Sequence, residues 1–238
     1  MERSAMIRGV AFDLDDTLYL ERDFVRSGYG AVARTVAERI QVPRETIFRL
    51  MWDRFVTGNR DAFDTLLSAY SDAKRHFTVE QLIQIYRNHR PALRLPEESR
   101  RLLLWLRRKG FLIGIVSDGY LETQRAKITA LGLDSLVDLI VLTDEWGREC
   151  WKPHWRGYET VAKAFGLPNR ALCYVGDNPA KDFRAPRALG WYTIRVRRSG
   201  QVHCSVEPAS VEDSPHVTVN SVKAVREELG RANASGGA

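Results

Sequence analysis

The segment from Gly9 to Leu18 reads GVAFDLDDTL, and it decides how the rest of the chain is interpreted. It begins with an apolar run and ends in carboxylates, a pattern typical of a buried strand that carries acidic groups at its C-terminal end. Asp13 and Asp15 are two residues apart, so on an extended backbone their side chains share one face. Two neighbouring carboxylates repel each other unless a proton or a cation lies between them. The segment therefore predicts a hard divalent cation, most often Mg²⁺, although a strand running into an acidic turn would give the same short pattern.

The composition is that of an ordinary globular chain with a mild basic excess. Of the 238 residues, 44% are hydrophobic and 28% are charged, which allows one ample core or a core domain with a smaller partner. Lys and Arg number 36 against 30 Asp and Glu, and the resulting charge of +6 favours phosphorylated small molecules or weak contact with nucleic acid. Because the basic residues are spread along the chain, no nucleic-acid partner is expected.

Cysteine usage and hydropathy predict a cytoplasmic protein. Cys150, Cys173 and Cys204 show neither close pairing nor metal-ligand spacing, and Cys173 lies in an apolar run typical of a core strand. No apolar segment is long enough to span a bilayer, and the N-terminus lacks the apolar stretch of a signal peptide. We expect a monomer or weak homodimer with no membrane partner.

Residues 19–95 have a helical pattern throughout. Apolar residues recur there at helical spacing, for example at Ile47, Met51 and Phe55, and no convincing strand appears. Thr78 to Gln81 is close to a capping box, which marks the start of one of these helices. The block is predicted to be a helical cap domain inserted after the first strand.

From residue 96 onward, predicted strands and helices alternate. After the first strand at 10–14, strands are predicted at 111–117, 139–142, 172–175, 192–196 and 217–219, with helices at 96–109, 121–131, 153–165, 180–189 and 221–229. This alternation predicts an α/β fold, a Rossmann-like three-layer core with a parallel sheet, built from residues 1–18 and 96–230. Residues 231–238, rich in Ala, Ser and Gly, are predicted to be a disordered tail.

Polar side chains follow each of the first four predicted strands. They are Asp13 and Asp15 after the first, Ser117 after the second, Lys152 after the third, and the segment 176–182 after the fourth. Because the carboxyl ends of parallel strands meet at one edge of a sheet, all of them are expected around one ligand site. Carboxylates, a hydroxyl and an ammonium are the groups that phosphoryl transfer requires.

These four segments resemble, in order, the motifs of the haloacid dehalogenase superfamily, in the subclass with a helical cap after the first strand. The motifs are D-x-D-x-T at 13–17, an apolar residue and Ser at 116–117, K-P at 152–153, and G-D-x-x-x-x-D at 176–182. Each is short and weakly specific alone, but four in series after four strands make a strong signal, and they frame nearly all of 10–196.

The resemblance implies a catalytic role for five of the matched residues. Asp13 would be the nucleophile that forms an aspartyl-phosphate, and Asp15 would protonate the leaving alcohol and later activate water. Lys152 would offset the charges of Asp13 and the phosphate. Ser117 would hydrogen-bond a phosphoryl oxygen, and Thr17 would orient Asp13 or the motif loop.

The resemblance also implies a bound Mg²⁺. Asp13, the backbone carbonyl of Asp15, and Asp177 would hold the ion, and Asp182 would be a further ligand or a partner behind the ligands. The ion would let one anion attack another by neutralising both.

Several of these residues also have simpler interpretations. Taken alone, Ser117 and Lys152 fit ordinary turn and helix-start positions, and Asp182 fits a helix cap. Asp16 and Asp118 are predicted to be turn acceptors and not catalysts. The paired acids at 13 and 15 are the hardest to explain by structure alone.

Within the superfamily, Asp15 favours a phosphatase. Dehalogenating members lack this second aspartate because a halide needs no proton to leave, so its presence predicts hydrolysis of a small phosphorylated metabolite, either a sugar phosphate or a nucleoside monophosphate. The phosphonate-cleaving branch uses a cap lysine, for which only Lys74 is a candidate, in a context that is not apolar. A sugar-phosphate mutase and a non-catalytic binding protein with the same fold stay open as alternatives.

Overall fold

The computed structural model describes residues 6–235, which divide into two compact units. The first unit contains the described residues up to Glu21 together with those from Arg94 onward, and the second unit is Arg22–Leu93. The second unit is therefore an insertion in the sequence of the first. None of the helices in the described range is long and apolar enough to cross a membrane.

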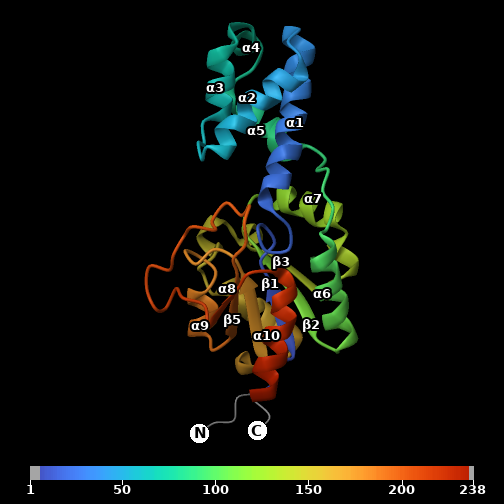
Figure 1. Ribbon diagram of the computed structural model, residues 1–238, viewed down its shortest axis with the longest axis vertical. Helices are drawn as coiled ribbons and strands as arrows, with labels where there is room; N and C mark the ends of the chain where they lie inside the picture. The colour runs from blue at the N-terminus through green and yellow to red at the C-terminus, as the bar shows by residue number, and fades with distance from the viewer. Residues whose placement is uncertain (1–5, 236–238) are drawn as a thin grey trace. The chain divides into compact units, whose positions relative to one another are not determined.

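A six-stranded, fully parallel sheet forms the centre of the first unit (Figure 1). Its strands are β1 (Gly9–Phe12), β2 (Leu112–Ser117), β3 (Leu139–Leu142), β4 (Leu172–Gly176), β5 (Tyr192–Val196) and β6 (Val217–Val219). The spatial order is β3-β2-β1-β4-β5-β6, and Ala11 of β1 pairs with Gly114 on one side and Tyr174 on the other. After β3 the chain crosses to the other side of β1, so the carboxyl end of β1 is the topological switch point where ligands bind in such sheets. The predicted α/β class with a parallel sheet is confirmed.

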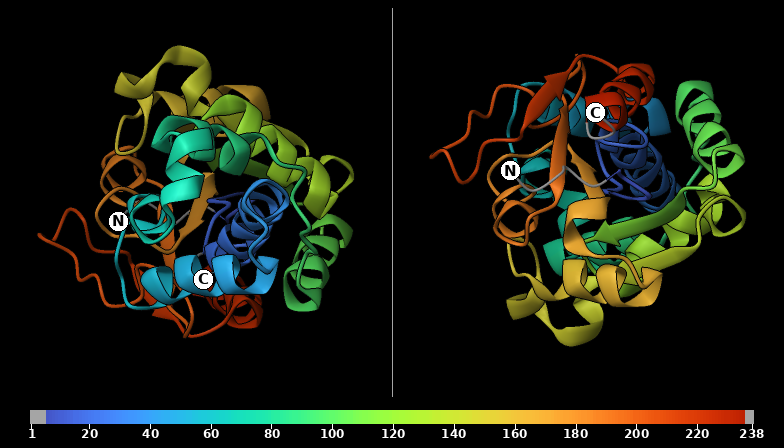
Figure 2. Two further views of the ribbon diagram at one scale, coloured as in Figure 1. Left: turned by 90° about the horizontal axis from the view of Figure 1, so that it is seen from above. Right: turned by 90° about the horizontal axis from the view of Figure 1, so that it is seen from below.

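Helices cover both faces of this sheet, as a parallel sheet requires. They are α6 (Glu97–Arg108), α7 (Leu121–Leu131), α8 (Arg156–Phe165), α9 (Arg184–Ala188) and α10 (Val222–Ser235). Helices α8 and α9 pack on one face, where Ala11, Val116 and Tyr174 belong to a single buried cluster. Helices α6 and α10 contact each other and lie against β2 and β5 on the opposite face (Figure 2).

Two helices begin more than one residue later than the sequence predicts. Helix α8 begins at Arg156 and not at 153; two short 3₁₀ turns, Thr143–Trp146 and Arg148–Cys150, precede it, and the Lys152 N–H then bonds the side chain of Asp118. Helix α9 begins at Arg184 and not at 180, because the residues after β4 fold around the carboxylate of Asp182. In both places the chain ahead of the helix brings polar groups to the edge of the sheet.

The predicted disordered tail is wrong for residues 231–235. Helix α10 continues through Ser235, and the side chain of Asn233 on its last turns joins the start of the chain. Its Oδ1 accepts a hydrogen bond of 2.7 Å from the Ile7 N–H, and its Nδ2 donates one of 3.2 Å to the Ile7 carbonyl. Both backbone groups of Ile7 are satisfied in this way, which fixes the final turns. Residues 236–238 lie outside the described range.

The inserted unit is helical and has its own core. Its helices are α1 (Glu21–Ile40), α2 (Arg44–Val56), α3 (Ala62–Ala69), α4 (Ser71–His76) and α5 (Val79–Asn88). Val36, Met51 and Leu82, from three different helices, are fully buried in one cluster. A capping box between Thr78 and Gln81 begins α5, since each side chain bonds the other residue's backbone N–H.

Candidate active site

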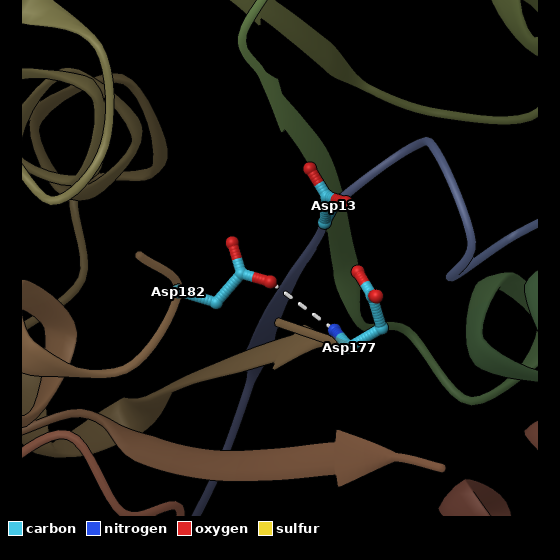
Figure 3. Close-up of side chains that lie close together, drawn as sticks. All are labelled: Asp13, Asp177 and Asp182. Carbon is cyan, nitrogen blue, oxygen red and sulfur yellow. Dashed lines mark hydrogen bonds between the residues drawn. The ribbon is translucent and has the colours of Figure 1, made fainter. Parts of the chain in front are cut away.

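Three buried carboxylates meet at the carboxyl ends of β1 and β4 (Figure 3). Asp13 follows β1, and its N–H donates a 2.8 Å hydrogen bond to the Val175 carbonyl of β4, which holds the two strand ends together. Asp177 follows β4, and Asp182 comes from the loop beyond it. Each offers one carboxylate oxygen within 4.8 Å of the others. The adjacent parallel strands thus deliver the acids to one point, as the motif order predicts.

Two oxygens of this cluster have no protein partner. Asp13 Oδ2 and Asp177 Oδ2 are buried and accept no hydrogen bond within residues 6–235. Burial, reinforced by the charges of Asp182 and Asp13, raises the pKa of Asp177 to about 9. Burial also raises the pKa of Asp13 to about 6, against the opposing effect of Lys152. Buried carboxylate oxygens that accept no hydrogen bond can be satisfied by a hard cation with oxygen ligands, so this donor set fits Mg²⁺.

Asp182 has both carboxylate oxygens occupied. Its Oδ2 accepts the N–H groups of Asp177 (3.1 Å) and Asn178 (2.9 Å), and its Oδ1 accepts Lys152 Nζ (2.9 Å). A Cβ on Gly176 would lie 2.6 Å from Asp182 Oδ2, so the loop closes on this carboxylate only because residue 176 is glycine. Asp182 is predicted to be either a metal ligand or a residue that supports the ligands. These contacts favour the supporting role.

Lys152 is the cation of the carboxylate cluster. Its side chain is fully buried, and its Nζ donates to Asp13 Oδ1, to Asp182 Oδ1 at 2.9 Å and to the Tyr174 hydroxyl at 3.1 Å. Burial alone would lower the pKa of Lys152, but the charges of Asp13 and Asp182 outweigh it and raise the pKa well above its ordinary value. The structure thus brings the K-P motif to the D-x-D motif, as the sequence predicts.

Asp15 lies in a different environment from Asp13. Lys127 Nζ donates to both of its carboxylate oxygens, at 2.8 and 2.9 Å, while Gln124 Nε2 donates to Oδ2 at 2.8 Å and the Tyr19 hydroxyl donates to Oδ1. Burial would raise the pKa of Asp15, yet the Lys127 ammonium and these donors together lower it below its ordinary value. Asp15 is therefore held as a carboxylate.

Lys127 and Gln124 of α7 are site residues that the sequence interpretation missed. They face inward although they are polar, on the same stripe of the helix as Ile128 and Leu131. Long polar residues at three- and four-residue spacing within an apolar stripe are the signal that could have identified them. Because α7 lies outside all four motifs, the motifs alone do not point to it.

Ser117 and Thr17, both predicted site residues, are buried beside these acids. Ser117 ends β2, and its Oγ accepts a 2.8 Å hydrogen bond from Gln124 Nε2, the same group that donates to Asp15. The Thr17 hydroxyl has no hydrogen-bond partner among the described residues, so its predicted orienting of Asp13 is not made through a hydrogen bond here.

Asp16 and Asp118 act as acceptors that tie loops together, in line with their interpretation from the sequence. Asp16, at a positive φ of 57°, accepts the N–H groups of Glu21 (2.8 Å) and Val202 (2.6 Å). Asp118 Oδ1 accepts the Thr143 hydroxyl at 2.7 Å and the Lys152 N–H at 3.0 Å. Asp118 thereby fixes the backbone of the lysine that contacts Asp13.

Two further basic residues near the site were not assigned a role from the sequence. Arg195 of β5 is buried, and its Nε donates a 2.9 Å hydrogen bond to the Asp177 carbonyl, which supports the loop after β4. Lys181 lies in that loop with its Nζ 3.8 Å from Asp118 Oδ2. Both bring positive charge towards a cluster rich in carboxylates.

Known proteins resemble this chain over most of its length. The glyceraldehyde 3-phosphate phosphatase of Methanocaldococcus jannaschii is 27% identical over 197 residues, which cover 80% of this chain and 85% of that protein. The phosphoserine phosphatase of Thermus thermophilus is 24% identical over an alignment of 245 positions, which spans 90% of this chain and 95% of that protein. Among solved structures, the hydrolase YfnB of Bacillus subtilis, solved with bound magnesium, matches with a TM-score of 0.65 at 19% identity, covering 94% of this chain and 99% of that one.

A family model matches most of the chain. The model describes a haloacid dehalogenase-like hydrolase and matches residues 7–190, which include all four motifs. The parallel sheet, the order of the motifs and the meeting of their side chains at the switch point agree with that match. The chain belongs to the haloacid dehalogenase-like hydrolases.

Proposed function

We propose that this hydrolase is a Mg²⁺-dependent phosphatase that cleaves a small phosphomonoester through an aspartyl-phosphate on Asp13. The observation that carries the proposal is the contrast between the two acids of the D-x-D motif. Asp13 has one oxygen fixed by Lys152 and the other without a partner, whereas both oxygens of Asp15 are held by donors from α7. Asp13 is thus available for attack on phosphorus, and Asp15 can act as the proton donor and acceptor.

The first half of the reaction would proceed at Asp13. One carboxylate oxygen of Asp13 attacks phosphorus, the bond from phosphorus to the ester oxygen breaks, and the leaving alkoxide takes a proton from Asp15. Lys152 keeps the Asp13 carboxylate ionised and oriented for this attack. The bound Mg²⁺ would be held by Asp13 and Asp177, and it would supply charge neutralisation between the carboxylate and the phosphoryl group.

The second half would release phosphate and restore Asp13. Asp15, now a carboxylate, removes a proton from water as the water oxygen attacks phosphorus, and the bond to Asp13 breaks. This step needs Asp15 as a carboxylate, and the hydrogen bonds from Lys127 and Gln124 support that form by stabilising its charge. For the first step it must be protonated, and a phosphoryl dianion beside it favours protonation because like charges raise a carboxyl pKa.

Two observations support the substrate class: the substrates in the names of the relatives, and the presence of Asp15. The relatives named above act on glyceraldehyde 3-phosphate and phosphoserine, which supports a small phosphorylated metabolite, with sugar phosphates first among the candidates. A halide leaving group would not require a proton from Asp15, so this residue favours phosphate-ester cleavage over dehalogenation.

The test is phosphate release from p-nitrophenyl phosphate and from a panel of sugar phosphates, nucleoside monophosphates and phosphoserine, with Mg²⁺ or with EDTA. We expect Mg²⁺-dependent release that Asp13→Asn abolishes, while the exposed Asp134→Asn serves as the matched control and keeps full activity. Product analysis with a hexose phosphate would reveal a mutase as an isomerised ester. Full activity of Asp13→Asn, or activity toward haloacids and not phosphate esters, would overturn the proposal.

A further inference from the structure

The turn that carries Asp15 contains a residue in an unfavourable backbone conformation. Asp16 lies at a φ of 57°, in the left-handed region that residues other than glycine seldom adopt. Within the turn, the Leu18 N–H donates a 3.1 Å hydrogen bond to the Leu14 carbonyl. A conformation of this kind persists only when the surrounding structure holds it, so contacts from outside the turn must fix its shape.

Three successive carbonyls of this turn, those of residues 16–18, each accept a hydrogen bond from a distant side chain. The donors are, in order, Gln201 Nε2 at 2.7 Å, Arg198 Nη2 at 3.3 Å and Ser99 Oγ at 2.5 Å. They lie 185, 181 and 81 positions along the chain from the carbonyls that they bind. Two of the three donors belong to residues 197–202, here called the β5 loop, so this loop is a principal support of the turn.

Gln201 uses both ends of its amide to connect the sheet with the turn. Its side chain is buried, its Nε2 also donates to the carbonyl of Val196 at the end of β5 (3.0 Å), and its Oε1 accepts the Arg198 N–H at 2.6 Å. The chain reaches Gln201 through Gly200, where a φ of 90° favours glycine. The glutamine therefore joins the last residue of β5 to Asp16.

The side chain of Asp16 makes a second connection to the same loop. Its Oδ2 accepts the N–H of Val202, the residue next to Gln201, and its Oδ1 accepts the Glu21 N–H at the start of α1. The turn and the β5 loop thus each contribute one side chain and one backbone group to their contact.

The position of Asp15 depends on this turn as well as on α7. Its carboxylate is held by donors from α7, whereas its backbone continues directly into Asp16. A change in the Asp16 conformation would therefore move the Asp15 carboxylate relative to those donors. Asp13 is supported separately, since its N–H donates to the Val175 carbonyl of β4. Loosening the turn should disturb the proton carrier more than the nucleophile.

We propose that Gln201 and Asp16 are positioning residues, which hold Asp15 where it can give a proton to the leaving alcohol. The inference rests on the proposed phosphatase function and deepens it, since it assigns alignment of the proton donor to the β5 loop. Both residues act through Asp15 and take no part in the bond changes at phosphorus.

The test compares kcat/KM for benzyl phosphate and p-nitrophenyl phosphate, at saturating Mg²⁺, in the wild type, Gln201→Met and Asp16→Asn. The benzyl alkoxide needs a proton to leave and p-nitrophenolate does not, and kcat/KM contains only the steps up to release of the alcohol. Misalignment of the proton donor should lower kcat/KM about 10- to 100-fold for benzyl phosphate and less than about threefold for p-nitrophenyl phosphate.

Asn233→Leu is the matched control for lost stability. It removes two hydrogen bonds to Ile7, which precedes β1 at the end of the strand opposite to Asp13. The ratio of the two kcat/KM values should stay as in the wild type. An unchanged ratio in both Gln201→Met and Asp16→Asn would overturn the inference and leave the phosphatase proposal standing.

A second measurement needs no turnover and decides the inference if the wild type cleaves no ester, the result that would sink the phosphatase proposal. The carboxyl carbon signal of Asp15 is recorded by NMR in the labelled protein and assigned by its loss in Asp15→Asn. It should move in Gln201→Met and in Asp16→Asn and keep its place in Asn233→Leu. If Gln201→Met does not fold, Asp16→Asn carries the comparison, and a wild-type signal there would overturn the inference.

Discussion

At the scale of single residues, the two acids of the D-x-D motif differ in what surrounds them. Asp13 lies beside other carboxylates and the buried Lys152, and burial raises its pKa to about 6. Asp15 faces Lys127 and Gln124, and its pKa lies below the ordinary value. Two carboxyl groups whose environments separate their pKa values are typical of a division between nucleophile and proton carrier.

Replacing Lys127 by methionine should move the acidic side of the pH–rate profile to higher pH. The ammonium lowers the pKa of Asp15, and without it burial would raise that pKa, so the carboxylate needed to activate water would be lost at a higher pH than in the wild type. The measurement is kcat for p-nitrophenyl phosphate from acidic to neutral pH, with Lys127→Arg as the control that retains the charge. An unshifted acidic limb in Lys127→Met would contradict this account of Asp15.

Replacing Asp177 by asparagine should stabilise the metal-free protein at alkaline pH and remove its response to Mg²⁺. The folded-state pKa of Asp177 is raised from 3.8 to about 9, so between these values the folded state binds the extra proton and stability falls as pH rises. Asparagine carries no charge to bury, which removes this loss. Thermal melts in EDTA and in Mg²⁺ across this pH range test both effects. A wild-type Mg²⁺ shift in the variant would exclude Asp177 as a ligand.

At the scale of elements, the loop between β4 and α9 is organised around Asp182. Its carboxylate accepts two backbone N–H groups and the Lys152 ammonium, and Arg195 of β5 supports the Asp177 carbonyl from behind. The loop therefore links Asp177, the proposed metal ligand, to the lysine of the K-P motif and to the sheet. A change in its backbone should affect all three together.

Gly176→Ala should disrupt this loop. The added Cβ would lie 2.6 Å from Asp182 Oδ2 and 2.9 Å from its Cγ, so the carboxylate would have to leave its backbone donors. Overpacking of this kind costs about 1–3 kcal/mol, and the lower thermal midpoint should come with a large loss of phosphatase activity. Gly230→Ala on α10 is the matched control, since its Cβ meets nothing within 4 Å and alanine favours the helix. Equal stability and activity of the two variants would show that Asp182 does not organise the loop.

The strands and the motif side chains could be predicted from the sequence because short apolar runs end in polar residues. The strands at 139–142, 192–196 and 217–219 have the predicted bounds. The starts of α8 and α9 could not be predicted, because the preceding residues give up helical hydrogen bonds for contacts that depend on Asp182 and on distant loops. Lys127 and Asp15 are 112 positions apart in the sequence, so no local pattern encodes their contact.

At the scale of the whole molecule, the strand order determines which distant segments meet. β1 lies between β2 and β4, so Asp13 has the Ser117 strand on one side and the Asp177 strand on the other. The K-P segment reaches the same point from beyond β3 through the hydrogen bond of Lys152 N–H to Asp118. The chemistry proposed for this hydrolase follows from that convergence, with Asp13 at its centre.

The most direct measurement is the identity of the residue that carries the phosphoryl group during turnover. The protein is quenched while it hydrolyses a phosphate ester with Mg²⁺, any acyl phosphate is reduced with borohydride, and the peptides are analysed by mass spectrometry. The account predicts homoserine in place of Asp13, with Asp15 unchanged and no conversion in Asp13→Asn. Steady phosphate release with no conversion at residue 13, or conversion at another carboxylate, would contradict it.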